Sequence, residues 1–431
     1  MDLKSTKTYY KQIFYLAMVA SILLMLMLML VTHGESARSV FFVDNKDSFM
    51  DHFNSVVYSY SDDPYANKVM YPPLAMLFYK VMGILVPMNI YDKLIEDPSL
   101  VLQPPAMKIY QGFTYGFMIF AVISGILFIF ALNEFKQGRK SEKLLFTTLI
   151  VLSAPFLFMM DRGNNIIIPL IFSIIFLTFY DSENKVLREI ALISLGLAVG
   201  FKLYPIAFGA LLLKEKHYKE LLRAAIYCIL FTIVPFFVFY NGFESIGLFF
   251  KNISSNSDIR GMKDTDQLNF SKMILYVLNV LRIKAFDLKA VSNIFNYVMT
   301  GLSIIGVFTV KERWKSVLLC CCVIYGFPKV TTSYMLVFFI LPLVMLLDNE
   351  KENKLLTYFY ILCFIAIFAP IPAVAPSTKL WTRYAMEKVS SFAVGLATVV
   401  AFSEGCKNLF SVLLNKFTKK EVQVLSNERL S

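Results

Sequence analysis

Charged residues are scarce in this chain, and their scarcity excludes a soluble protein of this size. Only 17% of the 431 residues are charged, whereas 57% are hydrophobic, and the mean hydropathy is +0.61. A surface that faces water needs charged side chains at about a quarter of its positions. The composition therefore predicts an integral membrane protein.

Patterns for metal binding and for disulfide pairing are also missing. The six cysteines contain no CxxC pair and lie within or at the ends of apolar runs, where a free thiol behaves as a small hydrophobic group. The three histidines are scattered. We therefore expect no structural zinc site, no disulfide framework and no cofactor. Asp264-Thr265-Asp266 spells a metal-binding Asp-x-Asp pattern and remains a candidate cation site.

Hydrophobic runs near the length that crosses a bilayer, about 20 residues, recur along the whole sequence. They predict an all-α polytopic membrane protein with about twelve transmembrane helices in a single domain over residues 1–431. The first run precedes no small-residue cleavage motif, so we expect a retained helix. The spans near 190 and 204 are short, which suggests a broken or tilted pair around Lys202 and Pro205. The expected spans begin near Gln12, Gln111, Leu144, Ile166, Ile190, Tyr204, Ala224, Ala290, Ser316, Tyr334, Leu355 and Ser391.

The distribution of basic residues predicts the orientation. One set of short connections is rich in lysine and arginine, such as NEFKQGRKSEK and KEKHYKELLR, whereas the opposite set, such as DRGNN and FKLYP, carries single cations. The positive-inside rule then places both termini in the cytoplasm. Topology also explains the net charge of +11, so we expect a lipid bilayer and not nucleic acid as the partner.

Two long connections, at about 33–110 and 242–289, are then expected on the outer face. Residues 73–90 are apolar, but a lysine lies in the middle and prolines flank the segment, so we expect a helix in the membrane interface. The connection 242–289 is expected to be a polar loop followed by an amphipathic run.

Carboxylates gather in the first outer connection. Asp51 follows the first run by about twenty residues, and a partly desolvated carboxylate at the membrane surface can act as a general base. Asp44 and Asp47 are rivals, and whether Asp47 or Asp51 is the base stays open. Alternatively, these residues are solvated or cap a helix; Asp47-Ser48 suits the N-cap of a helix over 49–58.

Three cations on the same expected face suit an anionic ligand. Arg162 lies in the turn DRGNN, where a guanidinium can bind phosphate in a bidentate manner or pair with Asp161 and lipid headgroups. Lys202 lies among apolar residues, and an ionisable group at membrane depth is a functional candidate unless it snorkels to the surface. Lys329, after Phe327-Pro328, repeats this arrangement.

Aromatic residues accompany a rigid turn in the first outer connection. Tyr71-Pro72-Pro73 ends any preceding helix and sets the entry into the interfacial segment. Tyr71 and Tyr65 are also placed to line a site, where aromatic faces would bind sugar rings.

Taken in order, these segments resemble the GT-C superfamily of integral-membrane glycosyltransferases. The likeness is greatest to the bacterial polyprenyl-phosphate-sugar-dependent mannosyl- and arabinofuranosyl-type transferases. It covers roughly residues 40 to 345 and rests on FMDHFN, YPPL, DRGNN, FKLYP and FPKVTTSYMLVFFILPL. The resemblance implies interfacial helices in the first outer loop. It also implies an inverting transfer from a polyprenyl-phosphate sugar to a glycolipid or polysaccharide acceptor on the outer face of the cell membrane.

The resemblance implies a role for each matching residue. Asp51 would be the catalytic base, and Arg162, Lys202 and Lys329 would hold the donor phosphate. The residues expected to contact substrate are Asp47, Tyr65, Tyr71, Asn164 and Tyr334. The segment FPKVTTSYMLVFFILPL departs from the family pattern because it keeps only Tyr334 of that pattern. Which residues would bind the acceptor is therefore undecided.

Other functional classes make different demands on the sequence. A polymerase or ligase for diphosphate-linked oligosaccharides would need paired arginines in a late outer loop, and here Arg260 and Arg282 lie far apart. A transporter or flippase for lipid-linked sugars would show charges in the middle of helices and internal repeats. Both remain alternatives to a glycosyltransferase.

Overall fold

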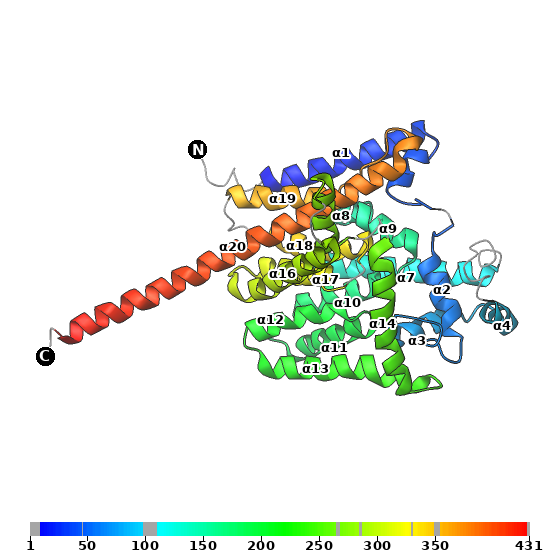
Figure 1. Cartoon of the computed structure of the whole chain (residues 1–431), viewed down its shortest axis with the longest axis horizontal. Helices are drawn as coiled ribbons and strands as arrows, with labels where there is room; N and C mark the ends of the chain where they lie inside the picture. Colours follow the sequence, from blue (N-terminus) through cyan, green and yellow to red (C-terminus); the bar gives the residue numbers. More distant parts are fainter. Residues whose placement is uncertain are drawn as a thin grey trace.

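The computed structural model describes residues 9–44, 46–97, 110–263, 268–283, 287–328, 331–348 and 354–428 (Figure 1). All regular elements in these ranges are helical. The α-helices are α1 (Tyr9–Val31), α2 (Met50–Ser59), α3 (Pro73–Met82), α4 (Met88–Glu96), α7 (Gln111–Phe135), α8 (Lys140–Val151), α9 (Ala154–Arg162), α10 (Ile167–Phe179), α11 (Lys185–Phe201), α12 (Gly209–Lys214), α13 (Tyr218–Ile233), α14 (Glu244–Lys263), α15 (Phe270–Val280), α16 (Leu288–Thr309), α17 (Arg313–Gly326), α18 (Ile340–Asp348), α19 (Lys354–Phe368) and α20 (Lys379–Glu428). The 3-10 helices are η2 (Glu35–Ser39), η3 (Tyr204–Phe208), η4 (Val234–Val238), η5 (Ser333–Phe339) and η6 (Pro376–Thr378).

Several helices have the length and composition of membrane spans. Five stretches qualify in the described part of the chain: α1, α7, Tyr218–Val238, α16 and Lys379–Ser411 of α20. A sixth is added if α8 and α9, which are bent by 56° relative to each other, form one span. These findings confirm an all-helical membrane protein, whereas the count of about twelve spans stays a prediction.

Burial separates central helices from peripheral ones. Nearly every residue of α17 and α18 is buried, and most of these side chains are apolar, as expected for helices packed on all sides. By contrast, α7 exposes a row of large apolar side chains that includes Met118, Val122 and Phe130. Such a surface is costly in water but not in lipid, so the outer helices face the bilayer.

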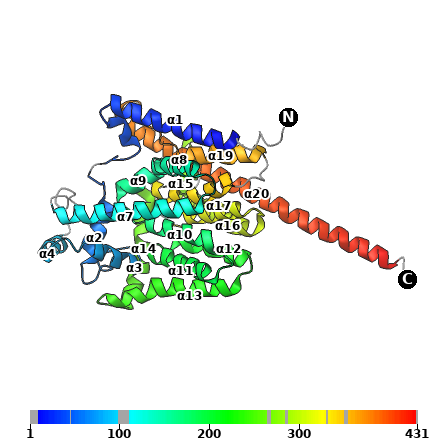
Figure 2. The ribbon, with the colours of Figure 1, turned by 180° about the vertical axis from the view of Figure 1, so that it is seen from behind.

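The two ends of the helix bundle differ in structure. Helices α2, α3 and α4 lie together at one end, here called the α2 end (Figures 1 and 2). Helix α1 begins and α20 ends at the opposite end, here called the terminal end, and α20 projects well beyond the bundle. Helix α14 crosses the α2 end, where Asn252 donates hydrogen bonds to the carbonyls of Tyr65 (2.8 Å) and Val69 (3.1 Å).

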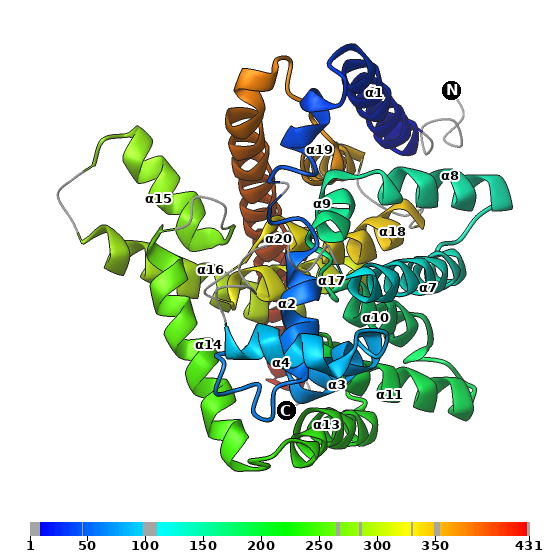
Figure 3. The ribbon, with the colours of Figure 1, turned by 90° about the vertical axis from the view of Figure 1, so that its right-hand side faces the viewer.

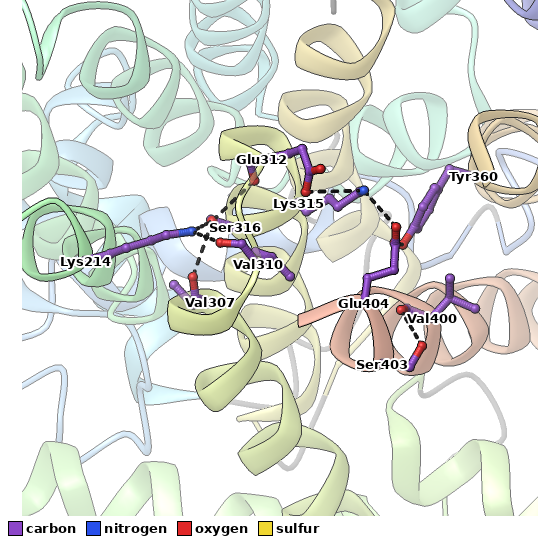
Figure 4. Close-up of polar contacts among 10 residues, drawn as sticks. All are labelled: Lys214, Val307, Val310, Glu312, Lys315, Ser316, Tyr360, Val400, Ser403 and Glu404. Carbon is purple, nitrogen blue, oxygen red and sulfur yellow. Dashed lines mark hydrogen bonds and ion pairs between the residues drawn. The ribbon is translucent and has the colours of Figure 1, made fainter. Parts of the chain in front are cut away.

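At the terminal end, ion pairs of the buried Lys315 and a hydrogen bond from Tyr360 tie α17, α19 and α20 together (Figure 4). The ammonium of Lys315 lies 3.0 Å from Glu404 Oε1 and 3.4 Å from Glu312 Oε2. Glu404 Oε2 accepts a hydrogen bond of 2.8 Å from the Tyr360 hydroxyl. Nearby, the ammonium of Lys214, the last residue of α12, donates a hydrogen bond of 2.6 Å to the Val310 carbonyl. Helix α12 is therefore also held at the terminal end.

One local expectation is correct and two are wrong. Helix α11 ends at Phe201 before η3, as the expected break near Lys202 requires. Residues 73–90, expected as one interfacial helix, contain α3 and the start of α4, and their place in the membrane interface stays a prediction. The proposed Asp47-Ser48 cap is wrong: α2 has Phe49 as its N-cap residue, with no side-chain cap and a φ of 65°. The polar loop expected after residue 242 is also wrong as far as Lys263, because helix α14 occupies Glu244–Lys263.

Candidate functional site

A left-handed glycine brings the end of α9 against the start of α2. Gly163 follows the last residue of α9 with a φ of 62°, a region that residues with a Cβ rarely adopt. A Cβ at this position would also lie 3.0 Å from the Cβ of His52 and 3.2 Å from the Cα of Phe49. In turn, the Phe49 amide donates a hydrogen bond of 2.6 Å to the Asp161 carbonyl. The turn DRGNN therefore packs directly on α2 because it contains glycine.

This contact places Asp51 between two donors. Arg162 Nη2 lies 2.5 Å from Asp51 Oδ1, and Asn164 Nδ2 donates to Asp51 Oδ2 at 2.8 Å. The guanidinium of Arg162 also forms an ion pair with Asp47 through Nη1. The Asp51 side chain is 18% exposed and that of Asp47 is 53% exposed. The position of Asp51 is thus determined by protein contacts on both oxygens, whereas Asp47 borders the solvent.

Tyr71 and Lys202 adjoin this carboxylate. Asn164 Nδ2 also lies 3.3 Å from the Tyr71 hydroxyl, and Lys202 Nζ lies 4.0 Å from the centroid of the Tyr71 ring. Lys202 is the extended residue that ends α11, and no carboxylate of the described residues lies within ion-pair distance of it. Desolvation lowers the pKa of Lys202 to about 7, and the negative charge of Asp51 opposes this shift.

Tyr334 closes the other side of the cluster. Burial raises the pKa of Tyr71 well above its usual value, and Tyr79, Asp51 and Tyr334 add to the shift. The ring of Tyr334, in η5, stacks on Phe158 with a centroid distance of 6.2 Å. Elements that are distant in the sequence, including α2 and α9, therefore meet at the α2 end (Figure 3).

The remaining predicted residues lie elsewhere or outside the described ranges. Tyr65 is buried with its ring against Phe236 and Phe249, and its hydroxyl donates to the Tyr71 carbonyl at 3.3 Å. It reaches the cluster only through the backbone of Tyr71. Lys329 and the candidate cation site at 264–266 lie outside the described residues.

Two features of the site were not predicted from the sequence. His52 is fully buried among aromatic rings, where burial lowers its pKa to about 3, so its imidazole is neutral. Arg383 and Glu387, on α20, are buried beside Phe158 and Ser333. Their spacing of four residues at the head of an apolar run was a usable signal for an ion pair, but the last span was expected to begin only near Ser391.

The cluster contains a proton acceptor, one side chain that is always positively charged and one whose charge depends on pH. The carboxylate of Asp51 can accept a hydroxyl proton, Arg162 is permanently charged, and Lys202 can bind an anion through its ammonium. In the described part of the chain, no group of three His, Cys, Asp or Glu side chains is placed to hold a metal ion. The site can therefore support proton abstraction beside a bound anion using these side chains.

Comparison with known proteins identifies the family. The model of glycosyltransferase family 87 matches residues 70–323, more than half of the chain. This range contains Tyr71, Arg162, Asn164 and Lys202. No match was found among curated proteins or among solved structures. The chain therefore belongs to glycosyltransferase family 87, one of the GT-C-type membrane glycosyltransferases.

Proposed function

We propose that this glycosyltransferase moves a sugar from a polyprenyl-phosphate donor to a hydroxyl of a glycolipid or polysaccharide at the outer face of the cell membrane. The observation that carries the proposal is the Asp51 carboxylate, held by Arg162 and Asn164 beside the buried end of Lys202. A sugar phosphate needs a base for the acceptor and a cation for the leaving phosphate, and the cluster contains both.

In this proposal Asp51 takes the proton of the acceptor hydroxyl. A carboxylate accepts hydrogen bonds and does not donate them, and the Asp51 side chain is 18% exposed, so a hydroxyl of the acceptor can donate to it. The acceptor oxygen then bonds to the anomeric carbon as the bond from that carbon to the phosphate oxygen breaks. Attack from the face opposite the phosphate inverts the configuration, and one base is enough for this course.

Lys202 is the best candidate to bind the donor phosphate. Arg162 is already paired with two carboxylates, whereas Lys202 lies over an aromatic ring with no carboxylate at ion-pair distance among the described residues. Its ammonium would stabilise the phosphate that leaves. Arg162 would then position Asp51 and add positive charge, and Lys329 would be a third cation. Tyr71, Asn164 and Tyr334 would border the sugars, and Asp47 would lie at the mouth.

We further propose the twelve-span topology, with the α2 end outside and both termini in the cytoplasm. Polyprenyl-phosphate sugars would enter laterally from the lipid. A cytoplasmic nucleotide-sugar donor would then lie on the wrong side of the membrane for Asp51.

A transfer assay tests the donor class. Purified protein in nanodiscs is offered polyprenyl-phosphate sugars or nucleotide sugars with a radiolabel on the sugar, with membrane glycolipids as acceptors. We expect label to move only from polyprenyl phosphate, and Asp51→Ala to abolish the transfer while donor binding persists. Transfer from a nucleotide sugar would contradict the proposed donor. If no donor reacts, but lipid-linked sugar crosses a liposome bilayer, the protein would be a transporter instead.

A further inference from the structure

Two phenylalanines on the approach to α2 have left-handed backbone conformations. The φ of Phe42 is 52° and that of Phe49 is 65°. A residue with a bulky side chain rarely adopts a positive φ, because its Cβ then crowds the following carbonyl. Strain of this kind persists only where surrounding contacts hold it, and it clusters at active sites. What holds these two residues therefore bears on the function of the site.

Both phenylalanines are held by one residue, Asp161, near the end of α9. The Phe42 amide donates a hydrogen bond of 3.0 Å to Asp161 Oδ2. The Phe49 amide donates one of 2.6 Å to the Asp161 carbonyl. The two rings also contact each other, with a centroid distance of 5.8 Å, and Phe49 packs on Phe117 of α7 at 4.5 Å. Asp161 thus holds Phe49 directly, through its carbonyl, and indirectly, through Phe42.

The Asp161 carboxylate is buried. The residue is 4% exposed, and removing a carboxylate from water is costly unless hydrogen bonds compensate. A carboxylate accepts from a backbone amide in a charge-assisted hydrogen bond, which is stronger than a bond between neutral groups. Such a bond is suited to hold Phe42 in a conformation that its own backbone disfavours. The proposed mechanism gives this carboxylate no role.

The start of α2 leads directly to the proposed base. Phe49 is the N-cap residue of α2, which has no side-chain cap, and Asp51 lies two residues further along. Arg162, which follows Asp161, holds the Asp51 carboxylate. A displacement of Phe49 would therefore move Asp51 relative to Arg162. A misplacement of about 1 Å is enough to slow a reaction severely.

We propose that Asp161 is a positioning residue for the glycosyl transfer. Its carboxylate holds Phe42, and its carbonyl holds Phe49, in strained conformations. These conformations place Asp51 beside Arg162. This role rests on the proposed function, in which Asp51 is the base. Asp161 itself takes no proton from the acceptor and contacts no substrate.

Three variants separate this role from a general effect on folding. Asp161→Ala removes the acceptor of the Phe42 amide, whereas Asp161→Asn keeps an oxygen that can accept from it. Phe42→Gly in the Asp161→Ala background removes the Cβ, so that a positive φ is no longer strained. Asp287→Ala is the matched control, because the Asp287 carboxylate also accepts from backbone amides, those of Lys289 and Ala290, but at the start of α16.

The measurements are kcat and donor KM with polyprenyl-phosphate sugars and membrane glycolipids, and the thermal unfolding temperature. We expect Asp161→Ala to lower kcat about tenfold to a hundredfold, because Asp51 is displaced, with the donor KM within about twofold of the wild type. Asp161→Asn should recover most of this loss, and the double variant should have a higher kcat than Asp161→Ala. Asp287→Ala should lower the unfolding temperature and leave kcat unchanged.

An unchanged kcat in Asp161→Ala would overturn the role of Asp161 while leaving the proposed function intact. The same holds if Asp161→Asn or the double variant is no more active than Asp161→Ala. Failure of the wild-type protein to use any polyprenyl-phosphate donor would overturn both.

Hydrogen exchange of the wild-type protein adds a measurement that does not depend on the folding of a variant. We expect the amides of Phe42 and Phe49 to be protected at least about a hundredfold relative to an unstructured chain, because Asp161 accepts from both. An unprotected Phe42 amide would overturn the role of Asp161.

Discussion

Arg162 links two carboxylates that the sequence could not rank. It contacts Asp51 at 2.5 Å and pairs with Asp47 on its other nitrogen. The two acids nevertheless differ, since only Asp51 also accepts from Asn164 and lies near Tyr71 and Lys202. The residue with more contacts to the interior is the better candidate for the base.

Asparagine at either position tests this assignment. We expect Asp51→Asn to lower kcat by about a hundredfold to ten-thousandfold, because the amide cannot take the acceptor proton. Asp47→Asn is the matched variant on the same arginine and should lower kcat less than about tenfold, since that carboxylate is more exposed. Transfer rates at saturating donor measure both, and the opposite order would make Asp47 the base.

The lowered pKa of Lys202 predicts a pH-dependent affinity for the donor. With a pKa of about 7, its ammonium is present below that pH and is lost as the pH rises through it. We expect KM for the donor to rise above about pH 7, because the neutral amine cannot pair with phosphate. In Lys202→Arg the guanidinium stays charged, so KM should become nearly constant from pH 6 to 9. A wild-type KM that is constant over this range would contradict the role of Lys202.

At the scale of elements, the site depends on where helices end. Helix α9 ends at Arg162 because Gly163 adopts a left-handed conformation, and α11 ends at Phe201 before the extended Lys202 and η3. The end of α9 places the positively charged Arg162 beside α2, and the end of α11 places Lys202 there. A continuous helix at either point would carry these side chains away, because successive residues of a helix turn by about 100°.

Alanine at Gly163 tests the first of these ends. The Cβ would meet His52 and the backbone of Phe49 and would also disfavour the left-handed φ. We expect Gly163→Ala to lower the thermal unfolding temperature and to reduce transfer strongly. Gly301→Ala, in α16 with open space around it, is the control and should change neither. Wild-type activity in Gly163→Ala would show that the turn is not needed to position Arg162.

At the scale of the whole molecule, the site and the chain termini lie at opposite ends of the bundle (Figure 1). The exposed apolar surface of helices such as α7 lies between these ends. A bilayer that covers this surface would separate the site from the termini. Contact with lipid would then stabilise the fold, because exposing these apolar side chains to water is unfavourable.

Cysteine labelling tests this orientation. In a Cys406→Ser background the other five cysteines are buried and should resist maleimide. We expect a membrane-impermeant maleimide to label Asp62→Cys, near the α2 end, in intact cells. Lys185→Cys, at the start of α11, should be labelled only after permeabilisation. The reverse pattern would place the site in the cytoplasm and exclude an outer-face acceptor.

Short windows of sequence were enough to predict the membrane class, the helical character and several chain breaks. Apolar run length, glycine and proline act locally, so α1, α7 and the break near Lys202 could be predicted from short windows of sequence. Arg162, Asn164, Tyr71 and Lys202 could be selected because polar residues beside apolar runs are costly without a purpose.

How these residues meet depends on the packing of the helices. Arg162 and Asp51 are 111 positions apart, so no local pattern could choose Asp51 over Asp44 as a partner. The unusual cap at Phe49 depends on the Asp161 carbonyl, which overrides the capping preference of Asp47-Ser48. Likewise, Arg383 and Glu387 acquire their place beside Phe158 only when α20 packs against α9 and η5. Contacts between distant segments depend on the shape of the folded bundle, and that shape is not contained in any single stretch of the chain.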